Sequence, residues 1–126
     1  MILTITLPWA DKALWPNSYR PHWTAKAKAT KAARSMSWAL TLEQLKGHQW
    51  PSKAARLAWV FHPKTKRIPD RTNCIISTKA WEDGIADAIG VNDRLFEATY
   101  TMGEPVKGGK VVVTITPYPI TESERN

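Results

Sequence analysis

Prolines and glycines divide this sequence into segments that alternate in kind. Residues 2–7 alternate apolar residues with threonine and stop at Pro8, which is typical of a β-strand. Residues 23–46 are rich in Ala, Lys and Arg, contain no proline or glycine, and are followed by Gly47. This pattern predicts a long helix. A second strand is expected over residues 54–62, which carry an apolar and aromatic run.

The second half of the chain repeats the alternation. Residues 72–89 have helical spacing and end at Gly90, a common helix terminator. Residues 95–102 and 110–116 are predicted to pair as a hairpin around a glycine-rich turn. The order β-α-β-α-β-β has too few alternating units for a doubly wound parallel sheet. We therefore expect an α+β fold with a small mixed sheet and two main helices.

The chain length indicates one domain. With 126 residues and 14.2 kDa, the chain can bury a real core. We place the domain at residues 1–117 and expect a loose tail at 118–126. No apolar run approaches the ~20 residues that span a bilayer, and the N-terminus lacks a secretory signal, so we expect a cytoplasmic protein. The single cysteine, Cys74, excludes an internal disulfide and is expected in the core.

Apolar spacing predicts which side chains form that core. For the first helix the expected buried face is Ala29, Ala33, Met36 and Leu40, and for the second it is Ile75, Ile76, Ala80, Ile85 and Ile89. Three tryptophans that fall in predicted elements are also expected in the core: Trp38, Trp59 and Trp81. Four aromatic residues in or beside the loop over residues 8–22 are equally compatible with anchoring that loop and with stacking on unpaired bases: Trp9, Trp15, Tyr19 and Trp23.

Charge is distributed unevenly along the chain. Between Lys12 and Pro69 there are twelve Lys or Arg residues and one acid, Glu43. Residues 70–97 then hold six acids against three basic residues. The net charge of +7 favours an acidic partner, because a basic surface binds a polyanion by releasing its counterions. Clustered carboxylates repel a polyanion unless a divalent cation lies among them. Together these features indicate a metal-dependent enzyme that acts on nucleic acid.

The acidic residues of the second helix allow two interpretations. Lys79, Asp83 and Asp87 follow at intervals of four and share a helix face, where they could form a solvated surface with a weak Lys79–Asp83 ion pair. They could instead contribute to a Mg²⁺ site, which needs only one or two carboxylates plus phosphate oxygens. Asp70 and Asp93 flank this helix, whose eighteen residues would span about 27 Å. A shared site therefore requires that the chain folds back, that the helix is shorter, or that a second subunit contributes.

Residues 69–94, P-D-R-T-N-C-I-I-S-T-K-A-W-E-D-G-I-A-D-A-I-G-V-N-D-R, resemble the core motif of the RusA family of Holliday junction resolvases, found mostly in phages and prophages. The matching positions are Asp70, Asn73, Lys79, Asp83-Gly84-Ile85, Gly90-Val91 and Asp93. The N-terminal part is similar too, with Leu7-Pro8-Trp9 ending the first strand and residues 14–23 leading into a basic helix. The resemblance covers residues 3–116.

This resemblance implies a small α+β homodimer that binds four-way DNA junctions and cuts two opposing strands symmetrically. It implies Mg²⁺ as the cofactor, with Mn²⁺ as a substitute, and Asp70 and Asp93 as metal ligands. Asp83 would support or join the metal site, and Lys79 would be the catalytic lysine. The expected DNA contacts are Arg20, His22, Lys26, Lys28, Lys31, Arg34, Lys64, Lys66, Arg67 and Asn73.

The chain departs from the family pattern at two positions. The second Asp of the usual Asp-x-Asp-Asn is Thr72, and the first Asp of the closing pair is Asn92. Each change replaces a charged oxygen ligand by a neutral one, which weakens cation binding. In some members the lysine lies only three residues after the Asn, where this chain has Ile76. The alternatives are therefore a junction-binding protein with little or no catalysis and a small basic adaptor for an acidic protein.

Overall fold

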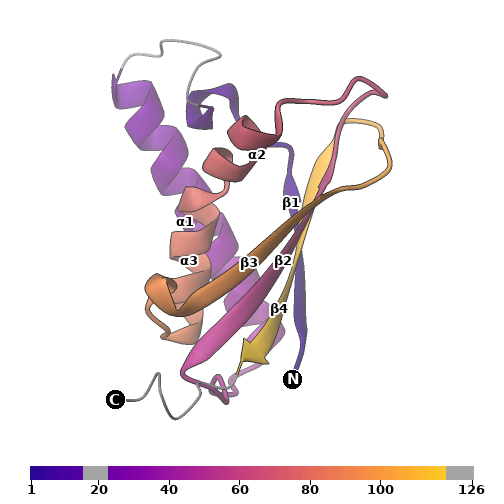
Figure 1. Cartoon of the computed structure of the whole chain (residues 1–126). Coiled ribbons are helices and arrows are strands. Elements are labelled where there is room, and N and C mark those ends of the chain that lie inside the picture. The colour runs from indigo at the N-terminus through magenta and orange to yellow at the C-terminus, as the bar shows by residue number, and fades with distance from the viewer. Residues whose placement is uncertain (16–22, 119–126) are drawn as a thin grey trace.

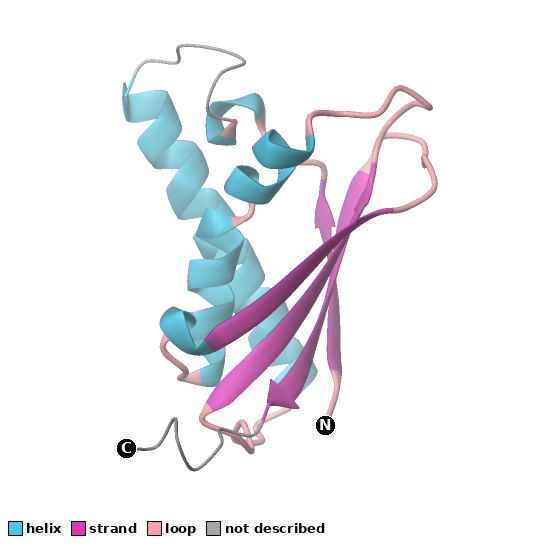
Figure 2. Ribbon diagram, in the orientation of Figure 1, coloured by secondary structure: helices cyan, strands magenta, loops and turns pink. Residues whose placement is uncertain are grey.

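The structure, a computed structural model, describes residues 1–15 and 23–118. Four strands form one mixed sheet in the order β1-β4-β2-β3, and the helices lie against one of its faces (Figures 1 and 2). In chain order the elements are β1 (Leu3–Pro8), η1 (Lys12–Leu14), α1 (Trp23–Leu45), β2 (Ala54–His62), α2 (Arg71–Ser77), α3 (Lys79–Ile89), η2 (Asp93–Leu95), β3 (Phe96–Met102) and β4 (Lys110–Tyr118). The expected α+β class with a small mixed sheet is confirmed.

The predicted hairpin of the last two strands is wrong. β4 pairs antiparallel with both β1 and β2, whereas β3 pairs parallel with the opposite edge of β2. β4 is one of the two inner strands, and its Val111, Val113 and Ile115 are almost fully buried. The inward residues of β3 are only half-buried, as suits an edge strand. A connection as long as residues 103–109 does not fix a hairpin register as a two-residue turn does.

The expected second helix is interrupted at Thr78, which separates α2 from α3. The Ser77 hydroxyl donates to the Cys74 carbonyl (2.7 Å), and the Thr78 hydroxyl donates to the Ile75 carbonyl (2.7 Å). Such side-chain bonds compete with the regular helical pattern. The interruption also changes which residues face inward, since Cys74, Ser77 and Thr78 are buried while Ile76 is 47% exposed. The prediction of Ile76 as a core residue is therefore wrong.

The core lies between the helices and the sheet. Trp59 on β2 and Trp81 on α3 are buried and stack with ring centroids 6.3 Å apart, which confirms both as core residues. Ile85 and Ile89 extend this contact along α3, as predicted. Trp38, in contrast, is 45% exposed, so its assignment to the core is wrong.

The buried face of α1 includes Ala33, as predicted, but otherwise differs from the expected one. Its buried residues are Ala33, Ser37, Thr41 and Leu45, whereas Met36 is 41% exposed. Apolar spacing does not select Ser37 and Thr41 for the buried face because both are polar, yet both are buried. Both satisfy their hydroxyls on backbone carbonyls: Ser37 donates to Trp81 (2.8 Å), and Thr41 donates to the Ser37 carbonyl (2.7 Å). Buried hydroxyls are tolerated when they are hydrogen-bonded in this way.

The strand β4 continues one residue past the expected domain end. Tyr118 pairs with Ala54, accepts a hydrogen bond at its carbonyl from the Ser52 hydroxyl (2.7 Å), and stacks beneath the Arg56 guanidinium. Tyr118 is therefore part of the sheet and not of a loose tail, while residues 119–126 of the predicted tail lie outside the described residues. None of the helices in the described ranges is long and apolar enough to span a membrane.

Candidate functional site

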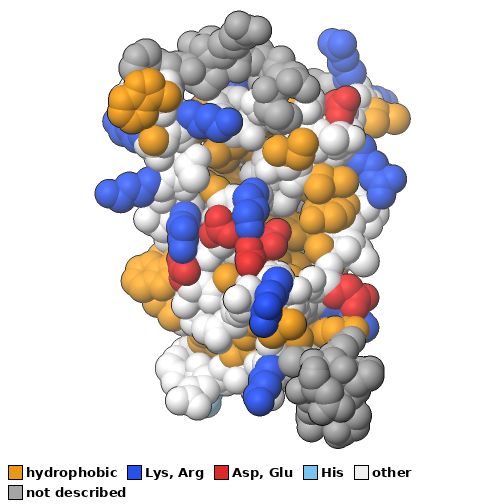
Figure 3. Space-filling model, turned by 60° about the vertical axis from the view of Figure 1, so that its left-hand side comes forward, with side chains coloured by type: hydrophobic (Ala, Val, Ile, Leu, Met, Phe, Trp, Pro, Cys, Tyr) orange, Lys and Arg blue, Asp and Glu red, His pale blue; other side chains and the backbone are white. Residues whose placement is uncertain are grey.

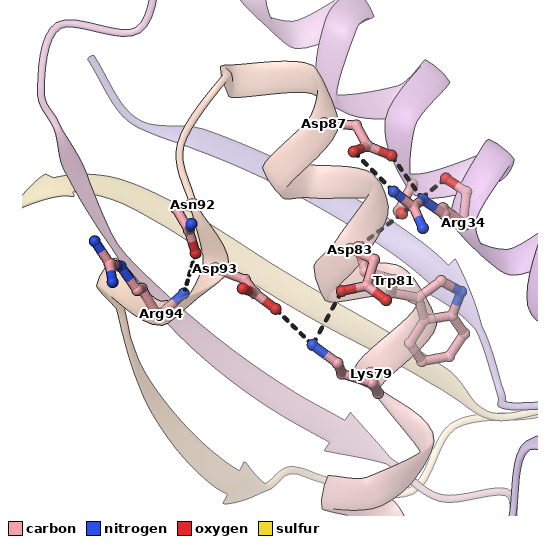
Figure 4. Close-up of polar contacts among 9 residues, drawn as sticks. Arg34, Lys79, Trp81, Asp83, Asp87, Asn92, Asp93 and Arg94 are labelled. Carbon is pink, nitrogen blue, oxygen red and sulfur yellow. Dashed lines mark hydrogen bonds and ion pairs between the residues drawn. The ribbon is translucent and has the colours of Figure 1, made fainter.

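Two aspartates converge on one lysine at the N-terminal end of α3 (Figure 4). The Lys79 ammonium lies 2.5 Å from Asp93 Oδ2 and 3.0 Å from Asp83 Oδ1. The Lys79–Asp83 pair is the i, i+4 contact expected from the sequence. The side chains are open to solvent, with 61% of Lys79, 28% of Asp83 and 34% of Asp93 exposed. We call these three residues the Lys79 cluster.

The chain reaches this arrangement by folding back after α3. Gly90 takes a left-handed conformation (φ +70°), and the amides of Gly90 and Val91 both donate to the Ala86 carbonyl. The reversed chain then enters η2, whose first turn is capped by the Asn92 side chain, which accepts from the Arg94 amide (3.0 Å). The fold-back brings Asp93 to Lys79, whereas the three routes that the sequence left open concerned a site shared by Asp70 and Asp93.

The charges of the Lys79 cluster reinforce one another. Hydrogen bonds to Asp93 and Asp83 raise the pKa of Lys79 well above its ordinary value, so the ammonium persists through neutral pH. The same contact with Lys79 lowers the pKa of Asp93. A lysine that stays protonated in this way cannot serve as a general base, but it can donate hydrogen bonds and supply a fixed positive charge.

Glu82 is a neighbouring acid that the sequence analysis did not select. It is half-buried, and burial raises the pKa of its carboxyl, Lys79 lowers it, and the negative charges of Asp93 and Asp83 raise it further. Its position three residues after Lys79 was the available signal, since i, i+3 residues share a helix face. Behind it lies Tyr100 of β3, whose hydroxyl pKa is raised by burial and by the Glu82 charge.

Asp70 lies elsewhere, at the start of α2. Its carboxylate accepts from the Asn73 amide (3.0 Å), so it caps that helix. Asn73 thus contacts Asp70 through its backbone. Across residues 1–15 and 23–118, no three His, Cys, Asp or Glu side chains gather closely enough to hold a metal ion. The structure therefore brings together Lys79, Asp83 and Asp93, while Asp70 stands outside that group.

Asp87 is engaged in a separate contact with α1. The Arg34 guanidinium donates to both of its carboxylate oxygens, at 2.7 and 2.9 Å (Figure 4). This bidentate pair raises the pKa of Arg34 and lowers that of Asp87. Arg34, selected as a phosphate contact, is thus held on the helix surface by Asp87 beside the Lys79 cluster.

The remaining basic candidates that the structure describes are exposed. Lys26, Lys28 and Lys31 lie on the N-terminal half of α1, and the others lie in the β2–α2 connection: Lys64, Lys66 and Arg67. Both segments lie at the same end of the molecule (Figure 1). On the face in Figure 3, acidic side chains gather in the middle with Lys and Arg side chains among and above them. Arg20 and His22 lie outside the described residues.

Cys74 is a core residue, as predicted. It is 1% exposed, and burial, followed by the charge of Asp70, raises the pKa of its thiol to about 11. A buried thiol with a raised pKa is a poor nucleophile because the thiolate is the reactive form.

Comparison with known proteins gives one informative match. No model of a known protein family matches the chain. An uncharacterized protein of Xylella fastidiosa (strain Temecula1) is 38% identical over 116 residues, which cover 90% of this chain and 75% of the relative. The chain therefore belongs to the same protein family as this Xylella fastidiosa protein.

Proposed function

We propose that the protein is a Mg²⁺-dependent endodeoxyribonuclease of the RusA type, which acts as a homodimer and resolves four-way DNA junctions by paired symmetric nicks. The sequence resemblance over residues 69–94 supplies the reaction class. The observation that carries the proposal is the convergence of Asp83 and Asp93 on one cationic position at Lys79. Without the fold-back at Gly90, Asp93 would be separated from Lys79 by the length of α3.

The donor set of the Lys79 cluster is compatible with Mg²⁺. This ion prefers oxygen ligands and is commonly held by one or two carboxylates together with phosphate oxygens and water. Asp83 and Asp93 are the carboxylates that would hold it, and Glu82 lies close enough for its pKa to respond to both. Bound there, Mg²⁺ would activate water and offset the negative charge that builds on the scissile phosphate.

The residues of the chain have separate parts in such a reaction. Lys79, kept protonated by its two carboxylates, donates hydrogen bonds toward a phosphate oxygen and adds a fixed positive charge. Asp70 orients the start of α2 by capping it, and the family resemblance gives it a further part as a ligand. Arg34 is held by Asp87 at the border of the cluster.

Binding would depend on the exposed basic residues of α1 and of the β2–α2 connection. Phosphate contacts position a protein on DNA and account for most of its salt-dependent affinity. Resolving a junction takes two symmetric cuts, and one chain offers one Lys79 cluster, so a two-fold dimer is the simplest functional unit. The cytoplasm of a bacterial host is the compartment that suits this activity.

A non-catalytic junction-binding protein is the second candidate. One observation favours it: the Lys79 ammonium already lies between the two carboxylates and offsets their charge without a metal ion. Thr72 and Asn92 favour it as well, since both replace acidic positions of the family pattern, and the Asn92 side chain is engaged in capping η2.

Cleavage of a labelled synthetic four-way junction, beside a linear duplex of the same sequence, distinguishes the two candidates. The proposal expects paired symmetric nicks on the junction alone with Mg²⁺ or Mn²⁺, and none in EDTA.

Asp93→Asn should reduce cleavage at least ~100-fold while junction binding is kept, because removing a negative charge favours binding of the DNA phosphate. Asp87→Asn is the matched control and should still cut, since Asp87 pairs with Arg34 outside the cluster. Tight binding with no cutting in either metal would contradict the enzyme and support the binding protein.

A further inference from the structure

A groove distinct from the Lys79 cluster lies where β1 leads into η1, beside the β2–α2 connection. It consists of two adjoining depressions that share Trp9 and Lys64. We call it the Trp9 groove and define it by Trp9, Lys12, Trp15, Lys64, Arg67 and Pro69. The first depression alone has a volume of about 530 Å³, so the groove is large enough for a flat ring system.

The two tryptophans form a fixed aromatic surface. The ring centroids of Trp9 and Trp15 are 6.2 Å apart, with their planes tilted by 43°. Both side chains are partly buried and pack against the core, where they line a small internal space together with Phe61, Cys74 and Val111. Each tryptophan therefore contacts the core and also lines the open groove. A ligand that stacks there needs to immobilise few side-chain torsions, which lowers the entropic cost of binding.

Two basic side chains, Lys64 and Arg67, lie beside these rings. Within the described part of the chain, neither Lys64 nor Arg67 makes an ion pair. Among the described residues that line the groove, the one acid is Asp11, which caps η1 by accepting from the Ala13 amide (2.8 Å).

Lys64 and Trp9 both lie close to the backbone of Gly109. A Cβ at Gly109 would lie 3.0 Å from Lys64 Cγ and 3.1 Å from Trp9 Cβ. The residue also has φ +72°, which favours glycine. The stem of Lys64 and the side chain of Trp9 therefore pack close to Gly109 and line the same groove.

We propose that the Trp9 groove binds an unpaired nucleotide of a DNA strand, with its base stacked on Trp9 and Trp15 and its phosphates on Lys64 and Arg67. Aromatic rings combined with a basic groove are the usual means of holding single-stranded nucleic acid, whereas an acidic peptide offers charge without a stacking ring. The groove ends at Pro69, directly before Asp70 and α2. The inference deepens the proposed function, since a branched junction can supply unpaired nucleotides near its crossing point.

Binding of a short fluorescent oligothymidylate to the full chain in EDTA tests the groove. Trp15→Leu keeps apolar contact with the core but removes the flat ring, and should weaken binding about 5- to 20-fold. Trp38→Leu is the matched control, a partly exposed tryptophan of α1, and should bind like the wild type. Lys64→Gln should weaken binding several-fold and lower the slope of log affinity against log salt by about 1, whereas Lys53→Gln should do neither.

The outcomes separate this inference from the proposed function. If Lys64→Gln, which changes an exposed side chain, binds the oligothymidylate with unchanged affinity and slope, the groove proposal is overturned even when the wild type cuts junctions. Equal binding by folded Trp15→Leu and the wild type would overturn it too. If both variants lose affinity while the wild type cuts no junction, the groove assignment holds and the nuclease proposal fails. Circular dichroism of each variant establishes that it is folded.

Discussion

At the scale of single residues, Lys79 controls the ionisation of the acids around it. Asp93 has a lowered pKa in the folded chain, so its contact with Lys79 stabilises the fold above the ordinary carboxyl pKa. That contribution is lost as pH falls through the folded pKa. Lys79 has a raised pKa, so its contribution to the stability of the fold is complete below the ordinary lysine pKa. That contribution is lost only as pH rises through the raised pKa. The contact therefore holds across the whole neutral range.

Replacing Lys79→Met should raise the pKa of Asp93 and of Glu82 together. The change removes the cation that lowers both values and leaves Asp83, Asp93 and Glu82 to repel one another. Carboxyl chemical shifts followed by NMR through an acid titration give the two values directly. In urea unfolding at several acidic pH values, the free energy of unfolding of the variant should fall less steeply with falling pH than that of the wild type. Lys79→Arg keeps the charge and should leave both pKa values nearly unchanged; if Lys79→Met also left them unchanged, the cluster geometry would be wrong.

Sequence spacing predicted part of this site and not the rest. The Lys79–Asp83 contact follows from helical geometry alone, because i, i+4 residues always share a face. The Asp93 contact does not, because it depends on the direction in which the chain leaves Gly90. The capping role of Asp70 was not predicted either, although Asp is a common N-cap, because the predicted helix began at Thr72, one residue after the true start at Arg71.

At the scale of elements, α1 and α3 approach closely at Gly84. A Cβ there would lie 2.1 Å from Ser37 Oγ and 2.2 Å from the Arg34 carbonyl oxygen. These distances are far below van der Waals contact, so glycine is required by packing. Gly84 of the Asp83-Gly84 pattern thus has a structural reason in this chain, the close approach of α1, whose Arg34 pairs with Asp87 of α3.

We expect Gly84→Ala to destabilise the protein by about 1–3 kcal/mol, because overpacking must separate the two helices. This loss should exceed the gain in helix propensity of about 1 kcal/mol for Ala over Gly. Chemical denaturation followed by circular dichroism measures the difference. The double variant Ser37→Ala/Gly84→Ala should recover little, because the Arg34 carbonyl belongs to the backbone and cannot be removed. A Gly84→Ala protein as stable as the wild type would mean that the helices are farther apart.

The elements themselves were predictable to different degrees. Strands β1 and β2 and the long helix α1 follow from local alternation and from the positions of proline and glycine. Local sequence does not predict that β3 pairs with β2. This pairing depends on the whole sheet, because β4 occupies one edge of β2 and leaves the opposite edge for β3. The inner face of α1 was misjudged for a similar reason: hydrophobicity cannot indicate that Ser37 is buried in order to donate to Trp81.

At the scale of the whole molecule, the two basic segments of greatest interest lie at one end, although more than thirty residues of sequence separate them (Figure 1). The N-terminal half of α1 brings Lys26, Lys28 and Lys31 to this end. The β2–α2 connection brings Lys64, Lys66 and Arg67. Lys46 and Lys53 lie toward the opposite end, after α1 and before β2. If total charge alone determined DNA binding, a lysine at either end would contribute equally. If DNA contacts one end only, the lysines at that end would contribute more.

Neutralising Lys28 and Lys31 together should weaken binding to junction and duplex alike. If each contacts one phosphate, the slope of log affinity against log salt should fall by about 2, since every phosphate neutralised contributes about 0.9. The matched variant Lys46→Gln/Lys53→Gln removes the same charge from the other end and should leave the slope nearly unchanged. Fluorescence anisotropy over a range of KCl concentrations measures both slopes. Equal losses in the two double variants would show that attraction is set by net charge, because a localised interface makes the two ends unequal.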